Sequence, residues 1–117
     1  MNKRKFTRVV FEARVAVCFR GVTTEAETRD VSLRGMFLDR FLAVPLGEEV
    51  EVEISIPDAE KILSTKATAI RYQDGGTGFQ FGAMDFDAFF ALQEIIARLS
   101  GTPGQVMTEV MSFVNNP

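Results

Sequence analysis

The chain has 117 residues, of which 46% are hydrophobic and 25% are charged, as expected for one globular domain. It contains no histidine and one cysteine, Cys18, which excludes an intramolecular disulfide, a cysteine-based metal cluster, a histidine-dependent catalytic triad and histidine-ligated zinc. The formal net charge of −3 argues against a protein that binds duplex nucleic acid through a broad basic surface. Because the sequence has neither a long apolar run nor a signal-peptide pattern, we expect a cytoplasmic protein that does not insert into a membrane.

The first half of the chain predicts β-strands. Residues 9–20 alternate between apolar and mostly polar side chains, which is typical of a half-buried strand. Gly21 ends this strand, and residues 22–31 predict a second one that forms a hairpin with the first. A short strand over residues 36–38 and an alternating strand over residues 49–56 follow, the latter with its glutamates facing water.

The strand pattern continues as far as residue 82. Residues 61–72 predict a strand with weaker alternation, residues 74–76 form a tight-turn sequence, and residues 79–82 predict the last strand. About six short strands separated by turns favour a mainly β fold, namely a small six-stranded antiparallel barrel.

The pattern changes to a helical period after Asp85. Either Asp85 or Asp87 is suited to cap the helix start, Arg98 suits its end, and residues 100–104 stop it. Residues 105–114 predict a short second helix that is marginal on its own. The apolar residues that follow the helical period are Phe86, Phe89, Phe90, Leu92, Ile95, Ile96 and Leu99.

The chain therefore divides into three segments. Residues 1–8 form a flexible arm, residues 9–100 form the barrel with its C-terminal helix, and residues 101–117 form a tail that contains the short helix. The tail could pack on the barrel, form a homodimer contact or fray.

The arm carries a concentration of positive charge that the rest of the chain lacks. Outside it, nine basic residues face sixteen acidic ones, a formal charge of −7. This contrast is consistent with a local anion-binding site, although a basic arm can also serve solubility alone. The basic residues of the arm are Lys3, Arg4, Lys5 and Arg8.

Two short motifs flank the first hairpin. Arg4 and Arg8 stand four residues apart before it, and Asp30, Ser32 and Gly35 follow its second strand as DxSxxG. If residues 9–31 form a hairpin, Arg8 and Asp30 lie at the same end of it, so the two motifs converge. Taken separately, the arginines could be solvated, and Asp30 and Ser32 could form only a turn.

The combination of RxxxR before the first strand and DxSxxG after the second resembles the PilZ family, over roughly residues 3–100. The resemblance implies a PilZ-type barrel that binds the bacterial second messenger cyclic di-GMP as a ligand, without cofactor, metal or catalysis. It assigns ligand contacts to five residues and leaves three basic neighbours as secondary contacts. The five are Arg4, Arg8, Asp30, Ser32 and Gly35, and the three are Lys3, Lys5 and Arg34.

The residue types fit that ligand. An arginine fork matches the O6 and N7 acceptors of guanine or a phosphate, whereas the Asp30 carboxylate matches guanine N1–H and N2–H₂. Ser32 can donate to a phosphate, and Gly35 lets the backbone approach closely. Ligand binding would then order the arm and signal to a separate protein partner. The alternatives are a PilZ-fold interaction module that acts without nucleotide, a single-strand nucleic-acid binder and, least supported, an enzyme.

Overall fold

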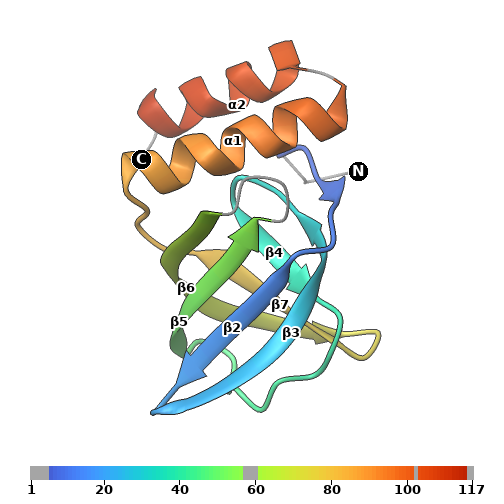
Figure 1. Cartoon of the computed structure of the whole chain (residues 1–117), viewed down its shortest axis with the longest axis vertical. Helices are drawn as coiled ribbons and strands as arrows, with labels where there is room; N and C mark the ends of the chain where they lie inside the picture. The colour runs from blue at the N-terminus through green and yellow to red at the C-terminus, as the bar shows by residue number, and fades with distance from the viewer. Residues whose placement is uncertain (1–5, 57–60, 102, 116–117) are drawn as a thin grey trace.

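The computed structural model describes residues 6–56, 61–101 and 103–115. Figure 1 shows a barrel with a layer of two helices at one end. The elements in chain order are β1 (Val9–Val10), β2 (Arg14–Phe19), β3 (Val22–Val31), β4 (Gly35–Leu38), β5 (Glu49–Ile56), β6 (Lys61–Gln73), β7 (Gly76–Phe81), α1 (Phe86–Ser100) and α2 (Pro103–Asn115).

The sheet closes on itself. Its strands follow the order β1-β3-β2-β5-β6-β7-β4, and a further antiparallel pairing of β3 with β4 joins the two sides. The closed ring therefore contains β3, β2, β5, β6, β7 and β4, while β1 pairs with β3 outside it. Closure leaves the ring without free strand edges. The prediction of a six-stranded antiparallel barrel followed by a helix is confirmed.

Two hairpins have turns that the sequence determines directly. Arg20 and Gly21 join β2 to β3 with φ angles of 52° and 81°, and Asp74 and Gly75 join β6 to β7 with φ angles of 51° and 75°. Two consecutive positive φ angles are typical of the two-residue turn whose twist matches that of antiparallel strands. A glycine at the second position adopts this conformation at little cost.

The prediction of a single strand over residues 9–20 is wrong in one respect, because residues 11–13 separate β1 from β2. Thr28 of β3 explains the interruption. Its hydroxyl accepts from the Ala13 N–H at 2.8 Å and donates to the Phe11 carbonyl, replacing strand-to-strand hydrogen bonds there. The segment can therefore leave the regular ladder while its buried backbone groups stay satisfied.

Helix α1 covers the end of the barrel and contacts β1 and β6. The Asp85 carboxylate caps its start by accepting from the Ala88 N–H at 2.8 Å, and Gly101 ends it with φ 70°. Its apolar stripe completes the barrel core, and α2 lies on the side of α1 away from the barrel (Figure 1). The predicted second helix is thus present, beginning at Pro103. In the described part of the chain, no helix has the length and hydropathy needed to cross a membrane.

Candidate functional site

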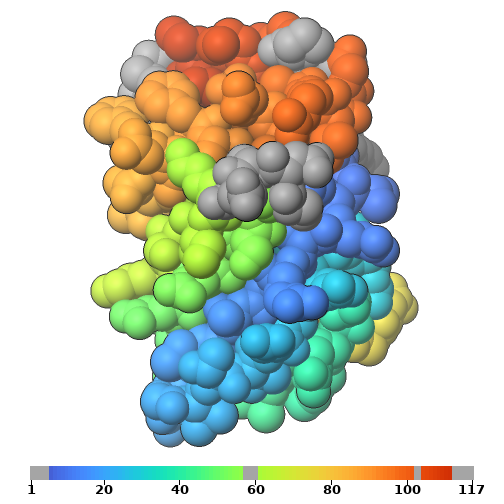
Figure 2. Space-filling model, viewed as in Figure 1, coloured from blue at the N-terminus to red at the C-terminus, as the bar shows by residue number. Residues whose placement is uncertain are grey.

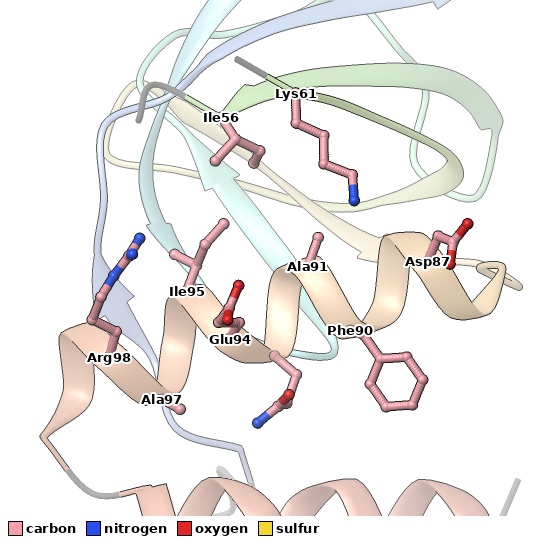
Figure 3. A pocket seen from close by; sticks show the side chains of 10 residues that line it. Ile56, Lys61, Asp87, Phe90, Ala91, Glu94, Ile95, Ala97 and Arg98 are labelled. Carbon is pink, nitrogen blue, oxygen red and sulfur yellow. The ribbon is translucent and has the colours of Figure 1, made fainter. Parts of the chain in front are cut away.

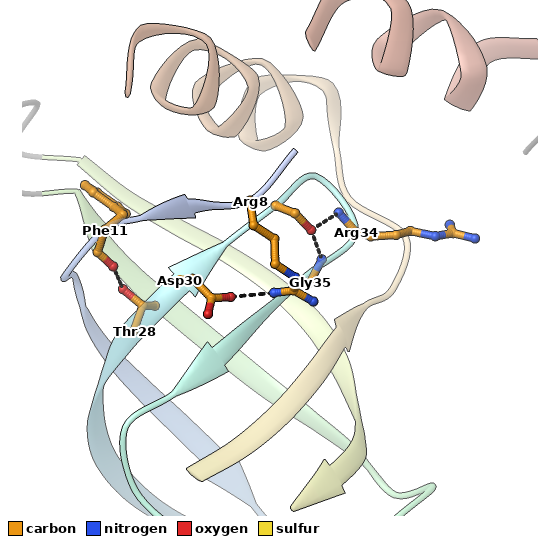
Figure 4. A network of polar contacts seen from close by, with 7 residues as sticks. Arg8, Phe11, Thr28, Asp30, Arg34 and Gly35 are labelled. Atoms are coloured by element: carbon orange, nitrogen blue, oxygen red, sulfur yellow. Dashed lines mark hydrogen bonds and ion pairs between the residues drawn. The ribbon is translucent and has the colours of Figure 1, made fainter. Parts of the chain in front are cut away.

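The two motifs meet as the hairpin geometry predicts. Arg8 lies immediately before β1, and Asp30 lies at the end of β3, where it pairs in register with Val10. The Arg8 Nη1 atom is 2.5 Å from the Asp30 Oδ1 atom, and Figure 4 shows the two side chains pointing toward each other. Both remain accessible, with 20% and 29% of their side chains exposed. The structure therefore brings together two of the five predicted contact residues in one accessible ion pair.

A β-bulge directs Asp30 to the outside of the barrel. Thr28 is buried, so strict alternation would also turn Asp30 inward. The pairing of β3 with β4 shifts between Thr28 and Asp30, which leaves Arg29 as an extra residue in β3. This insertion reverses the alternation, so Asp30 faces outward while Val31 is buried.

Ser32 organises the turn between β3 and β4. Its hydroxyl oxygen accepts from the backbone N–H groups of Arg34 at 3.1 Å and Gly35 at 3.3 Å, and its own N–H donates to the Gly35 carbonyl at 2.8 Å. Ser32 is only 2% exposed. In this structure its side chain fixes the loop that follows Asp30, and a direct ligand contact by Ser32 stays a prediction.

Gly35 allows a close approach of two backbones. A Cβ atom at this position would clash with the Phe79 carbonyl on β7, and Gly35 has no positive φ angle. The glycine is therefore required by strand packing. In the DxSxxG motif, Ser32 and Gly35 therefore shape the backbone beside the site, and Asp30 is the accessible side chain.

Thr7, one of the residues of the expected flexible arm, is held by hydrogen bonds to α2 in this structure. The Glu109 carboxylate of α2 accepts from the Thr7 N–H at 2.9 and 3.0 Å and from the Thr7 hydroxyl at 2.6 Å. Glu109 is only 4% exposed, and Gln105 also donates to it at 3.3 Å. Figure 2 shows the blue N-terminal segment at the surface where the helices meet the barrel. We refer to the Thr7–Glu109 contact as the arm clamp.

Of the other basic residues predicted to contact the ligand, the structure describes only Arg34. The Arg34 guanidinium carbon lies 5.7 Å from the centre of the Phe6 ring, next to the arm. The other three predicted contacts, Lys3, Arg4 and Lys5, lie outside the described residues. No local pattern in the sequence points to Glu109, because its carboxylate contacts a residue 102 positions away.

Other features of the surface do not extend this site. A cavity of about 810 Å³ lies between α1 and the facing ends of β5 and β6, and Figure 3 shows Ile56, Lys61 and Arg98 beside it. None of the predicted ligand residues lines that cavity. Within the described ranges, no group of three or more cysteine, aspartate or glutamate residues is placed to hold a metal ion.

Comparison with known proteins decides the family. A model described as the PilZ domain matches residues 2–99, which include both motifs. The chain belongs to the PilZ family. No curated protein sequence matches this PilZ domain.

Solved structures show the same fold at low sequence identity. The PilZ domain of YcgR from Escherichia coli with c-di-GMP has a TM-score of 0.71 and 16% identity, covering 99% of this chain and 100% of that one. A longer YcgR chain in complex with c-di-GMP gives 0.75 and 17%, covering 94% of this chain and 51% of that one. The Bacillus subtilis inhibitor of motility MotI/DgrA gives 0.71 and 17%, covering 84% and 51%. This PilZ domain thus spans about half the length of those two chains.

Proposed function

We propose that this PilZ domain is a receptor for cyclic di-GMP that relays binding to a protein partner and catalyses no reaction. The observation that carries the proposal is the Arg8–Asp30 pair, since it joins the two halves of the family signature in one accessible place. Two structural neighbours described with c-di-GMP support the same ligand.

The pair offers complementary chemistry to a guanine nucleotide. A guanidinium can bind the O6 and N7 acceptors of guanine or a phosphate, and a carboxylate can accept from guanine N1–H and N2–H₂. In this structure each group satisfies the other, and the Arg8 Nε atom is buried without a hydrogen-bond partner among the described residues. Binding therefore requires the pair to open, so that the ligand replaces each partner of the ion pair.

Opening the pair connects the site to α2 through the arm clamp. Thr7 is the direct neighbour of Arg8, so a shift of the arm toward the ligand pulls on all three hydrogen bonds from Thr7 to Glu109. A carboxylate that is 4% exposed is costly to leave unpaired, by several kcal/mol in typical proteins. Release of Thr7 therefore favours movement of α2, which changes the helical surface that a partner contacts.

The wider assignment follows from this function. The arm of residues 1–8 acts as the moving part, residues 9–100 as the receptor body and residues 101–117 as the output segment. The receptor acts in the cytoplasm on a separate protein effector, without duplex nucleic acid or membrane insertion, and a homodimer through the tail is one form the output can take.

Isothermal titration calorimetry tests the proposal. The purified protein should give saturable heat with cyclic di-GMP and none with GTP or cyclic di-AMP. Arg8→Ala and Asp30→Ala should each abolish binding with the thermal unfolding transition retained, whereas Arg14→Ala, on an exposed position of β2, should bind like the parent. Tight binding by both site variants would refute the site. A folded parent protein that does not bind cyclic di-GMP would favour the alternative, a PilZ-fold interaction module that acts without nucleotide.

A further inference from the structure

Four residues form an outward-facing row across the barrel that begins at the proposed site. Cross-strand pairs connect Asp30 to Phe37, Phe37 to Gly78 and Gly78 to Arg71, through β3, β4, β7 and β6. Phe79 follows Gly78 and is 1% exposed, as expected for the inward face of β7. The row therefore lies on the solvent side, and it places Arg71 on the same surface as the Arg8–Asp30 pair.

The far end of the row is built in the same way as the near end. Ala69 is buried, so strict alternation along β6 would also turn Arg71 inward. The pairing of β6 with β7 shifts between Ala69 and Arg71, which makes Ile70 an extra residue. The bulge reverses the alternation and places Arg71 outside, as the bulge at Arg29 does for Asp30.

Phe37 is an outward-facing aromatic ring that two arginines cover. It is only 6% exposed, because the guanidinium carbons of Arg29 and Arg71 lie 4.9 Å and 5.8 Å from the ring centre. Gly78 leaves room for this arrangement, since a Cβ atom there would lie 3.1 Å from the Arg71 Cγ atom. Stacking on a ring holds a planar guanidinium in place while its N–H edge stays available.

Neither arginine has an anionic partner in the described part of the chain. The ion pairs found there join Arg8 to Asp30, Arg20 to Glu48 and Lys66 to Glu49. The Arg71 Nε atom is also buried without a hydrogen-bond partner within the described residues. Two pre-oriented cations without carboxylates, Arg29 beside Asp30 on β3 and Arg71 three strands away on β6, form a surface that favours an anionic ligand with a planar base.

We infer that Arg29 and Arg71, held on Phe37, form a second subsite that binds the guanine and phosphate distal to the Arg8–Asp30 pair. This inference rests on the proposed function. The Arg71 fork matches guanine O6 and N7 or stacks on the base, and Arg29 neutralises the adjoining phosphate. The fork geometry is what lysine lacks, so Arg71 contributes to recognition beyond its charge.

Calorimetric titration with cyclic di-GMP tests the subsite in four single variants. Arg71→Ala and Arg29→Ala should each weaken binding by about 10- to 100-fold, the range of one lost charge-assisted or bidentate contact. Arg71→Lys keeps the positive charge but not the planar fork, and it should weaken binding nearly as much as Arg71→Ala. Arg14→Ala serves as the matched control and should stay within twofold of the parent.

The outcomes separate the two proposals. Parent-like affinity of Arg71→Ala, in a protein that binds cyclic di-GMP, overturns the subsite and leaves the proposed function standing. Parent-like affinity of Arg71→Lys overturns recognition by the planar fork. The Arg71→Lys variant provides this test even if Arg71→Ala unfolds. Absence of binding by the folded parent overturns both proposals.

Discussion

Replacing Glu109 with glutamine is expected to tighten cyclic di-GMP binding, because it weakens the contact that holds the arm away from the ligand. The parent carboxylate receives two donors from Thr7, its N–H and its hydroxyl, while it is 4% exposed. Glutamine keeps the size of the side chain but has one acceptor oxygen in place of two, so one of the two Thr7 donors loses its acceptor. One hydrogen bond to a charged group contributes about 1.5–3 kcal/mol net.

That loss sets the expected change in affinity. If nucleotide binding breaks the arm clamp, the cost of breaking this hydrogen bond reduces the binding free energy of the parent protein. The Glu109→Gln variant lacks that hydrogen bond and does not have this cost. At 1.4 kcal/mol per factor of ten, the dissociation constant should fall by about 10- to 100-fold. Hydrogen exchange should also show faster exchange of the Thr7 amide, independently of any ligand.

Calorimetry of Glu109→Gln, Thr7→Val and the double variant provides the assay. Because both single changes act on one contact, their effects on affinity should be non-additive. Thr108→Val is the matched control, since Thr108 lies exposed on α2 and its hydroxyl bonds only within the helix, to the Gly104 carbonyl at 3.1 Å. Unchanged or weaker binding by Glu109→Gln, with normal thermal unfolding, would refute the coupling and indicate that the arm binds nucleotide in its clamped position.

Three further changes test how the site is built, each by urea unfolding. Asp85→Ala removes the α1 cap and should cost about 1 kcal/mol, and no loss would contradict its capping role. Gly35→Ala should destabilise by about 1–3 kcal/mol through its clash with the Phe79 carbonyl, whereas Gly104→Ala, where an added Cβ meets nothing, should be neutral or stabilising by up to about 1 kcal/mol. Thr28→Val leaves the buried Ala13 N–H and the part-buried Phe11 carbonyl without their partner and should cost about 1–3 kcal/mol, so a parent-like midpoint would refute its bridging role.

Features that depend on neighbouring residues were predictable from sequence. The positive φ angles at Gly21 and Gly75 follow from turn sequences, and Asp85 precedes a helical apolar period. The meeting of Arg8 and Asp30 also followed, because a hairpin brings its two ends together. These predictions needed only local geometry.

The remaining features depend on contacts that local patterns do not encode. The β-bulge at Arg29 inserts an ordinary residue into a strand that reads as regular, so its effect on Asp30 was not visible. The arm clamp joins residues 102 positions apart and depends on how α2 packs. The break between β1 and β2 arises because a threonine on another strand replaces ladder hydrogen bonds.

The bulge at Arg29 has an evolutionary consequence. Deleting this one codon would join Thr28 directly to Asp30, so that strict alternation along β3 would keep Thr28 and Val31 in the core and Asp30 on the solvent side. RxxxR and DxSxxG would both survive such a deletion unchanged. A relative that is shorter by this one residue in β3 would therefore keep both the signature and the outward direction of Asp30, so the strand before the motif can vary in length at this point without loss of the Arg8–Asp30 pair.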